Sequence, residues 1–211
     1  KYVCEKCKDT GFIGKDMCTC LKKLFVEYIY ENSHLKQKFD EENFDTFRLD
    51  YYSEINNGKS KLSPRENMEL ILKVVHSFCD EFNGERNLFF HGQAGLGKTF
   101  LCNAIAKELL DKGYSVVYYS ACNLFKLVSD ATFNRDNLSQ STELKNIYNA
   151  ELLIIDDLGT EFITSLSTSE FFNILNTRID NKKSTIISSN LEISSLRDTY
   201  SERVSSRIIQ I

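Results

Sequence analysis

The motif G-x-x-x-x-G-K-T lies near the middle of the chain. Glycines at this spacing allow successive backbone N–H groups to curl around one anion, and a following helix adds the positive end of its dipole. The lysine would reach the β- and γ-phosphates of a nucleotide, and the threonine hydroxyl would bind Mg²⁺. We expect this phosphate-binding loop to consist of Gly92, Gln93, Ala94, Gly95, Leu96, Gly97, Lys98, Thr99 and Phe100.

Two acidic residues follow a run of four aliphatic residues in the segment L-L-I-I-D-D, residues 152–157. So apolar a run predicts a strand that is buried on both faces of a parallel sheet, and ligands bind at the carboxyl ends of such strands. We expect Asp156 to hold Mg²⁺ through water, alongside the hydroxyl of Thr99, and Asp157 to be the base that polarises the attacking water. Acids that only cap the next turn are the alternative.

Three more polar side chains lie in the last 25 residues, one at the end of a predicted strand and two on a predicted helix. Asn190 ends a predicted strand, where its amide would orient the water and touch the γ-phosphate, or would simply make a turn. Arg203 and Arg207 are four residues apart and share one helix face. Two cations on one face indicate an anionic target such as phosphate, with pairing to nearby acids as the alternative.

Four of the seven cysteines form a C-x-x-C and a C-x-C pair near the amino end, namely Cys4, Cys7, Cys18 and Cys20. Two thiolate pairs on facing turns can place four sulfur atoms around one tetrahedral Zn²⁺. Because so short a segment has little core of its own, the metal would hold it folded. A redox pair or untethered thiols are the alternatives, but a redox C-x-x-C is expected beside a βαβ pattern, and none precedes the strand at Leu88.

Composition limits the class of protein. A chain of 211 residues has room for one α/β domain and a small appendage. The net charge of −4 excludes an overall basic field that attracts nucleic acid. No run of about 18 apolar residues is present, so no membrane span is expected, and dispersed thiols are typical of a cytoplasmic protein. Since the chain starts with Lys1, we expect it to be a piece of a longer protein.

The strongest secondary-structure signals alternate between strands and helices. Strands are predicted at 88–90, 115–120, 152–157 and 184–189, and helices at 64–82, 100–110, 121–131, 144–148, 171–180 and 200–207. The 64–82 helix has Ser63 as its cap, and the 171–180 helix is expected to be capped from Ser167. Residues 132–142 are polar and predict an exposed loop. This alternation predicts an α/β fold with a parallel sheet.

Ahead of this domain, the apolar spacing over 21–38 predicts a helix. The irregular stretch that follows carries aromatic residues set among acids, namely Phe39, Phe44, Phe47, Tyr51 and Tyr52. These rings would either wall the adenine of a nucleotide or merely pin the linker to the core. Both alternatives stay open from the sequence.

The segments G-Q-A-G-L-G-K-T, L-L-I-I-D-D-L-G-T-E, T-I-I-S-S-N-L and S-E-R-V-S-S-R occur in this order. Together they resemble the AAA+ ATPases of the bacterial and phage DnaC/DnaI-type helicase-loader group, part of the IstB-like ATP-binding group. The C-x-x-C-K-D-T-G-F and C-x-C segments look like the zinc module that precedes many of these ATPases. The resemblance covers nearly the whole chain. It implies a zinc module at 1–22, a linker at 23–62 and a three-layer αβα P-loop AAA+ core at 63–211.

The resemblance also implies residue roles. Lys98 and Thr99 would be Walker A, Asp156 Walker B and Asn190 sensor I, with ATP or ADP, Mg²⁺ and Zn²⁺ as cofactors. Arg207 would be an arginine finger that acts on ATP held by a neighbouring subunit, supported by Arg203. Most AAA+ proteins have Glu where this chain has Asp157, so the base is either Asp157 or Glu161. The helical lid and a helicase-binding segment are expected outside this chain.

The implied function is an ATP-driven loader that delivers a replicative hexameric helicase to single-stranded DNA, with slow hydrolysis in the monomer. One alternative is a transposase-helper ATPase of the IstB kind, which shares the core but would favour a long basic amino-terminal region. Another is a nucleotide-gated binding module with negligible turnover, because an aspartate replaces the usual glutamate.

Overall fold

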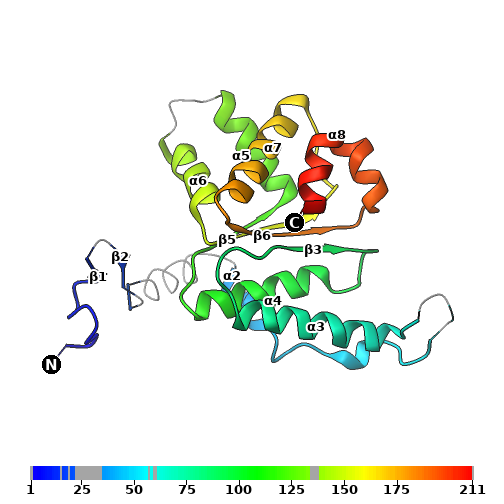
Figure 1. The fold of residues 1–211 in the computed structure, drawn as a ribbon, viewed down its shortest axis with the longest axis horizontal. Coiled ribbons are helices and arrows are strands. Elements are labelled where there is room, and N and C mark those ends of the chain that lie inside the picture. Colours follow the sequence, from blue (N-terminus) through cyan, green and yellow to red (C-terminus); the bar gives the residue numbers. More distant parts are fainter. Residues whose placement is uncertain are drawn as a thin grey trace.

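The computed structural model describes residues 2–14, 16–18, 20–21, 35–56, 58, 61–133 and 138–210. Its elements alternate along the chain as the sequence predicts (Figure 1). They are β1 (Phe12–Ile13), β2 (Asp16–Met17), α2 (Leu35–Glu41), the 3₁₀ turn η1 (Leu49–Tyr51), α3 (Pro64–Asp80), β3 (Leu88–His91), α4 (Lys98–Asp111), β4 (Val116–Ser120), α5 (Ala121–Phe133), α6 (Leu138–Asn149), β5 (Leu152–Leu158), α7 (Ser165–Asp180), β6 (Ser184–Ser189) and α8 (Ile193–Gln210).

Four strands form one parallel sheet in the order β3-β6-β5-β4. The two strands that the sequence places nearly 100 residues apart, β3 and β6, are direct neighbours, with Leu88 opposite Ile186. Because all strands run in one direction, the residues that follow β3, β5 and β6 meet at the same edge of the sheet. The predicted parallel α/β sheet is therefore confirmed.

The sheet has helices on both faces, as Figure 1 shows: α3 and α4 on one face, and α5 to α8 on the other. Side chains of a strand alternate between the two faces. In β5, Leu152 and Ile154 join the core beneath α3 and α4, whereas Leu153, Ile155 and Leu158 join the core beneath α5, α7 and α8. All five are fully buried, which is why this strand reads as a continuous apolar run.

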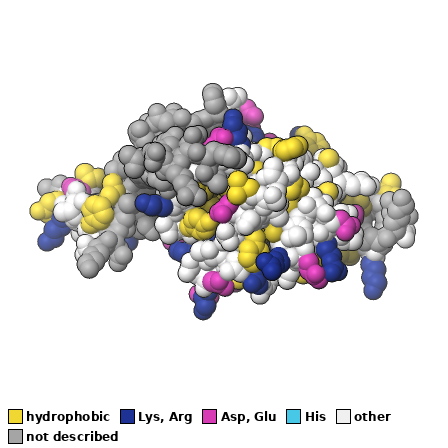
Figure 2. Space-filling model, turned by 90° about the horizontal axis from the view of Figure 1, so that it is seen from above, with side chains coloured by type: hydrophobic (Ala, Val, Ile, Leu, Met, Phe, Trp, Pro, Cys, Tyr) yellow, Lys and Arg dark blue, Asp and Glu magenta, His cyan; other side chains and the backbone are white. Residues whose placement is uncertain are grey.

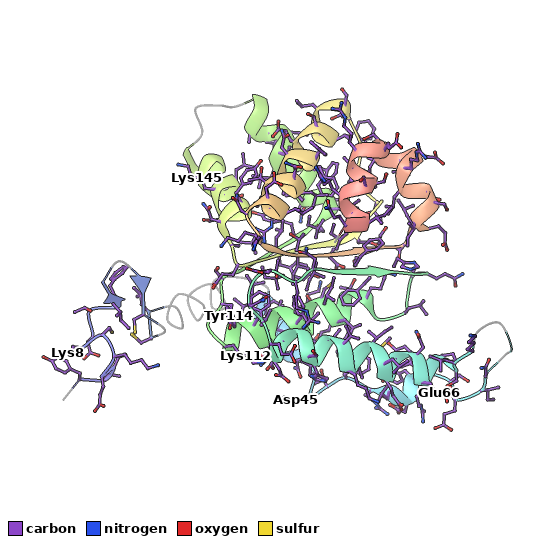
Figure 3. All side chains as sticks on the ribbon, in the orientation of Figure 1. Lys8, Asp45, Glu66, Lys112, Tyr114 and Lys145 are labelled. Atoms are coloured by element: carbon purple, nitrogen blue, oxygen red, sulfur yellow. The ribbon has the colours of Figure 1, made fainter. Side chains whose placement is uncertain are left out.

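The start of α3 follows the predicted capping box. Ser63 accepts a hydrogen bond from the N–H of Glu66, and the Glu66 carboxylate accepts one from the N–H of Ser63 at 2.8 Å. Pro64 occupies the first helical position, where no N–H is needed. Figure 3 labels Glu66 at this end of α3. The hydrogen bonds to Ser63 hold the pKa of the Glu66 carboxyl below its usual value.

Two predicted boundaries are wrong. Helix α7 is capped by Thr164 instead of Ser167: Thr164 accepts from the N–H of Ser167, which is itself the third helical residue. Of the predicted loop at 132–142, the first two residues end helix α5, residues 134–137 lie outside the described residues, and the chain is helical again from Leu138. Polar composition does not prevent a helix whose few apolar residues face a core. Here Ile147 is fully buried in the core, and Leu144 packs against the same core.

The predicted helix at 200–207 is the second part of the longer helix α8. The chain kinks at Ser201, where φ is 82° and ψ is 160°. Arg203 and Arg207 both follow this kink. The predicted helix at 21–38 lies mostly outside the described residues, and its described end is α2.

Figure 2 shows the molecule from above, with hydrophobic side chains among polar ones and with basic and acidic side chains intermingled on the described part of this face. None of the helices in the described ranges has the length and apolar character that crossing a membrane requires.

Candidate functional site

The predicted phosphate-binding loop connects the end of β3 with the start of α4. The helix begins at Lys98, so the first-turn N–H groups and the positive end of its dipole face the loop. Gly95 and Gly97 have φ values of 81° and 88°. Side chains other than glycine adopt these left-handed values at a cost, so the loop depends on both glycines. The loop thus combines left-handed glycines with the amino terminus of a helix.

The ammonium group of Lys98 lies at the centre of this loop. It donates to the carbonyl oxygens of Gly92 and Gln93 at 2.7 and 2.8 Å and to Oδ1 of Asn190 at 2.6 Å. The loop after β3 is thereby joined to the end of β6, 92 residues away. Burial lowers the pKa of Lys98, and the charges of Asp157 and Asp156 act in the opposite direction.

Three hydroxyl groups surround the carboxylate of Asp156, which is only 6% exposed. Oδ1 accepts from Thr99 Oγ1 at 3.2 Å and from Ser188 Oγ, while Oδ2 accepts from the Tyr118 hydroxyl at 2.8 Å. Burial raises the pKa of Tyr118 well above its ordinary value, so its phenol stays protonated and donates. Donors from α4, β6 and β4 thus hold one carboxylate at the centre of the sheet edge.

Asp157 has a left-handed backbone, with φ of 61°. The pairing of β5 with β6 is irregular between Ile155 and Leu158, so the strand bulges where the two acids stand. The N–H of Asp157 donates to Ser188 Oγ at 2.8 Å, and its Oδ1 accepts from Asn190 Nδ2 at 2.8 Å. Backbone strain of this kind concentrates at functional sites, and here it turns Asp157 towards Asn190.

The alternative base, Glu161, is held differently. Its carboxylate accepts from the N–H of Gly159 at 2.9 Å and from the hydroxyl of Tyr200, a residue that is 1% exposed. The carboxylate therefore ties the loop after β5 to helix α8. No contact within the described chain connects it with Lys98 or Asn190. Of the two candidate bases, Asp157 is the one beside the phosphate-binding loop.

The donor set at this edge fits a magnesium ion. Mg²⁺ prefers hydroxyl and carboxylate oxygens and keeps several water ligands. Thr99 Oγ1 and Asp156 Oδ1 lie 3.2 Å apart and come from helix α4 and strand β5. One hydroxyl and one carboxylate at this separation are a suitable pair for an ion that also binds phosphate oxygens.

The aromatic stretch ahead of α3 packs on two sides. Phe39 is buried in the core of α3 and α4, and the ring of Phe44 lies 4.5 Å from that of His76. Phe47 contacts Phe100, the last residue of the predicted phosphate-binding loop, edge to face at 5.3 Å. Tyr51 is 78% exposed. These contacts pin the segment to the core, and Phe47 also brings it against the phosphate-binding loop.

The two candidate finger arginines lie on the second part of α8. Arg207 lies over the ring of Phe172, with 5.9 Å from its guanidinium carbon to the ring centre, and donates to Gln210 at 2.9 Å. Arg203 is exposed. Neither contacts Lys98 or Asp156 within the described part of this chain, so the fold does not bring them into the chain's own phosphate site.

The four amino-terminal cysteines come together in one cluster. Their sulfur atoms all lie within 4.8 Å of one another, with 3.8 Å between Cys4 and Cys18 and 3.3 Å between Cys7 and Cys20. Zn–S bonds of about 2.3 Å in a tetrahedron separate the sulfurs by about 3.8 Å. The backbone N–H of Cys20 lowers the pKa of the Cys18 thiol to about 7. The cluster therefore fits one zinc ion.

Two residues of this region were not found by sequence reasoning: Tyr118 and Ser188. Ser188 lies two residues before Asn190 in a strand that ends in polar residues, a signal that was available. The pattern V-V-Y-Y-S around Tyr118 predicts a strand but does not indicate which tyrosine faces the acids. Tyr52 is one of the aromatic residues noted in the sequence, but its spacing does not predict the hydrogen bond to the carbonyl of Leu96.

Comparisons with known proteins agree with this geometry. Replicative helicase loader DnaC of Escherichia coli K12 is 28% identical over 138 residues, which are 65% of this chain and 56% of that protein. Phage-like element PBSX protein XkdC of Bacillus subtilis is 27% identical, over 93% of this chain and 74% of its own length. The chain thus spans only about half the length of the DnaC relative that it matches.

A solved structure, described as the crystal structure of the DnaC helicase loader, superimposes with a TM-score of 0.61 at 26% identity, over 82% of this chain and 94% of that one. The parallel four-stranded sheet and its helices match the P-loop AAA+ fold, as the resemblance implied. The sequence profile described as IstB-like ATP binding protein matches residues 67–208, about two thirds of the chain. The chain therefore belongs to the IstB-like ATP-binding protein family and is similar to the DnaC-type AAA+ helicase loaders.

Proposed function

We propose that this protein binds ATP with Mg²⁺ at the loop between β3 and α4, hydrolyses it, and acts as a loader of a replicative ring helicase. One observation carries the ATPase part. Lys98, Asn190 and Asp157 form a continuous hydrogen-bonded chain next to the Thr99–Asp156 pair. These residues come from the start of helix α4, strand β5 and the end of strand β6. These groups, which support phosphate binding, Mg²⁺ binding and activation of a water molecule, lie at one edge of the sheet.

Each residue has a distinct task in this mechanism. The amides of residues 92–100 hold the phosphates, and Lys98 exchanges its carbonyl partners for phosphate oxygens. When bound, Mg²⁺ would be held by Thr99 and Asp156 and would neutralise charge on the phosphate oxygens. Asn190 orients the attacking water, and Asp157 accepts its proton. Asp157 is shorter than the usual glutamate, so we expect slow turnover.

The exposed position of Arg203 and the partly covered position of Arg207 suit an arginine that acts on a neighbouring copy. In phosphoryl transfer, such a finger raises the rate about 1,000-fold or more. ATP turnover per copy should therefore rise with protein concentration.

An equimolar mixture of Lys98→Ala and Arg207→Ala, each inactive alone, should regain turnover, because one protein supplies the finger and the other the phosphate site. If the mixture stays inactive although each variant is folded, the trans-acting role is wrong.

The relatives named replicative helicase loader DnaC support the loader role and a replicative helicase as partner. Single-stranded DNA as a second partner is part of our proposal. We would capture partners with the full-length protein, with and without ATP, and identify them by mass spectrometry. Enrichment of a ring helicase that depends on ATP supports loading. Capture of a transposase would instead place the protein with transposition helpers. Binding of ATP without any turnover would leave a nucleotide-gated binding protein.

We propose that Cys4, Cys7, Cys18 and Cys20 hold a structural Zn²⁺ in an amino-terminal module, ahead of a linker and the ATPase core. The support is the 4.8 Å cluster of four thiols. Metal analysis of the purified protein should give one zinc per chain, and Cys4→Ser should remove it while leaving nucleotide binding intact. Cys122→Ser, which changes an exposed cysteine outside the cluster, is the control. Zinc-free wild-type protein would exclude this site.

A further inference from the structure

Tyr52 belongs to the segment ahead of α3, yet its side chain reaches the phosphate-binding loop. Its hydroxyl donates to the carbonyl oxygen of Leu96 at 3.1 Å, across 44 residues of sequence. Its ring stacks on Phe47 at 5.9 Å with an interplanar angle of 12°, and Phe47 in turn packs against Phe100. Burial raises the pKa of Tyr52, so the phenol stays a donor at neutral pH. The hydroxyl is thus held in place by a row of rings.

The bond to Leu96 fixes the direction of one loop amide. The carbonyl of Leu96 and the N–H of Gly97 belong to the same planar peptide unit, and all peptide bonds of the described residues are trans. In a trans peptide these two groups point in opposite directions. If Tyr52 holds the carbonyl outwards, the N–H of Gly97 must point inwards, towards the space that the triphosphate occupies.

Gly97 shows how closely Tyr52 approaches the loop. A Cβ built on Gly97 would lie 2.5 Å from the Tyr52 hydroxyl oxygen, whereas the corresponding position on Gly95 meets no atom within 4 Å. Both glycines have left-handed φ values, so backbone conformation alone would require glycine at either position. At Gly97 the phenol adds a second reason, because it occupies the place of a side chain.

We propose that Tyr52 is a positioning residue for the triphosphate, which sets the Leu96–Gly97 peptide so that the Gly97 amide binds phosphate. The inference rests on the proposed nucleotide binding and assigns a task to the aromatic segment that differs from both alternatives considered above. Tyr52 acts on the phosphate end of the ligand through the backbone. It is neither a wall for the adenine nor only a packing residue.

The test is Tyr52→Phe in the full chain, which removes the hydroxyl and keeps the ring. Binding of ATP and of inorganic tripolyphosphate would be measured by calorimetry with Mg²⁺ present. One neutral hydrogen bond contributes about 1 kcal/mol, so we expect both ligands to bind about fivefold more weakly. Because tripolyphosphate lacks a base and a sugar, its loss of affinity reports on the phosphate cradle alone. The ¹⁵N–¹H signal of Gly97 should shift in the ligand-free variant.

Tyr51→Phe is the matched control, since Tyr51 is the adjacent tyrosine, is 78% exposed and has Arg48 over its ring instead of the loop. It should bind both ligands as the wild type does. Unchanged binding by Tyr52→Phe would overturn the inference, as would a loss for ATP with none for tripolyphosphate, because the phenol would then contact the nucleoside. If the wild type binds neither ligand, the proposed function itself fails, which is a different result.

Discussion

The two ends of strand β6 hold two cations in opposite ways. At the amino end, Arg178 is fully buried and donates to Thr185 Oγ1 at 3.0 Å and to the carbonyls of Ile147 and Ala150 at 2.7 and 3.1 Å. At the carboxyl end, Lys98 binds two loop carbonyls and Asn190, with two carboxylates close by. Both cations bind oxygen, but only one lies where a ligand can replace its partners.

The two cations differ in whether a ligand can replace their hydrogen-bond partners. Arg178 binds the last carbonyls of helix α6 and the first carbonyl of β6, which are parts of rigid elements in a closed core. Burial lowers its pKa to about 10, so it remains charged at neutral pH. Lys98 binds carbonyls of a glycine loop at an open sheet edge. A buried cation with its donors satisfied is a structural element, whereas a cation beside acids at the carboxyl edge can bind phosphate.

Lys98→Ala should have the largest effect on function and little effect on folding. Removal of one preorganised cation from a phosphate site costs about 3–4 kcal/mol of transition-state stabilisation. We expect ATP turnover to fall about 100- to 1,000-fold, with an unchanged melting temperature. Steady-state ATPase assays and calorimetric unfolding would measure both quantities. Lys126→Ala, on the exposed face of α5, is the control. A large loss of stability in Lys98→Ala would mean that Lys98 is a structural cation like Arg178, which contradicts the difference between the two ends of β6.

Arg178→Met should lower stability strongly and have little effect on nucleotide binding. Methionine keeps much of the volume but leaves the carbonyls of Ile147, Ala150 and Ser184 without their donor. Each buried carbonyl left without a partner costs about 1 kcal/mol or more, so we expect a loss of about 3 kcal/mol in the free energy of unfolding. Urea titration would measure it, and ATP affinity at low temperature should be retained. Arg197→Met, which removes only an exposed ion pair with Glu202, should cost less than about 1 kcal/mol.

Tyr118→Phe would test whether the carboxyl edge depends on residues outside the motifs. Loss of the 2.8 Å bond leaves one oxygen of Asp156 with fewer donors, so the carboxylate is held less firmly. We expect the Mg²⁺ concentration for half-maximal turnover to rise about fivefold, which corresponds to about 1 kcal/mol. Tyr119→Phe alters the neighbouring tyrosine, whose hydroxyl faces Glu143, and should leave the Mg²⁺ dependence unchanged. Equal responses of the two variants would contradict a positioning role.

Thr164→Ala should give the smallest effect. It would test whether a residue at the carboxyl edge can be structural without serving the site. Thr164 caps α7 at the same carboxyl edge, but its bonds go to Ser167 and Thr168. Loss of a helix cap costs about 1 kcal/mol, and we expect this loss in the unfolding free energy with ATP turnover unchanged. Thr168→Ala, one turn inside the helix, is the comparison and should cost less. A fall in turnover with Thr164→Ala would mean that the cap also serves the site.

Much of the fold was predictable because its signals are local. The apolar run in β5, the glycine loop and the capping box at Ser63 each depend on residues within a few positions of one another. The cap of α7 and the start of α6 were mispredicted, because several serines and threonines compete for the same role and a polar surface conceals a short apolar stripe. Boundaries that depend on such close alternatives are decided by packing.

The sequence by itself determined which chemistry is available: a phosphate-binding loop, two acids after a buried strand, an amide after another, and four clustered thiols. Only the tertiary structure decided which groups meet. The pairing of β3 with β6 joins Lys98 to Asn190, and the bulge in β5 turns Asp157 towards that amide. Tertiary packing also decided the contacts of Tyr52, Tyr118 and Arg178. Short-range preferences shape each segment, but contacts across 30 to 90 residues exist only after the sheet and its two helical layers have packed.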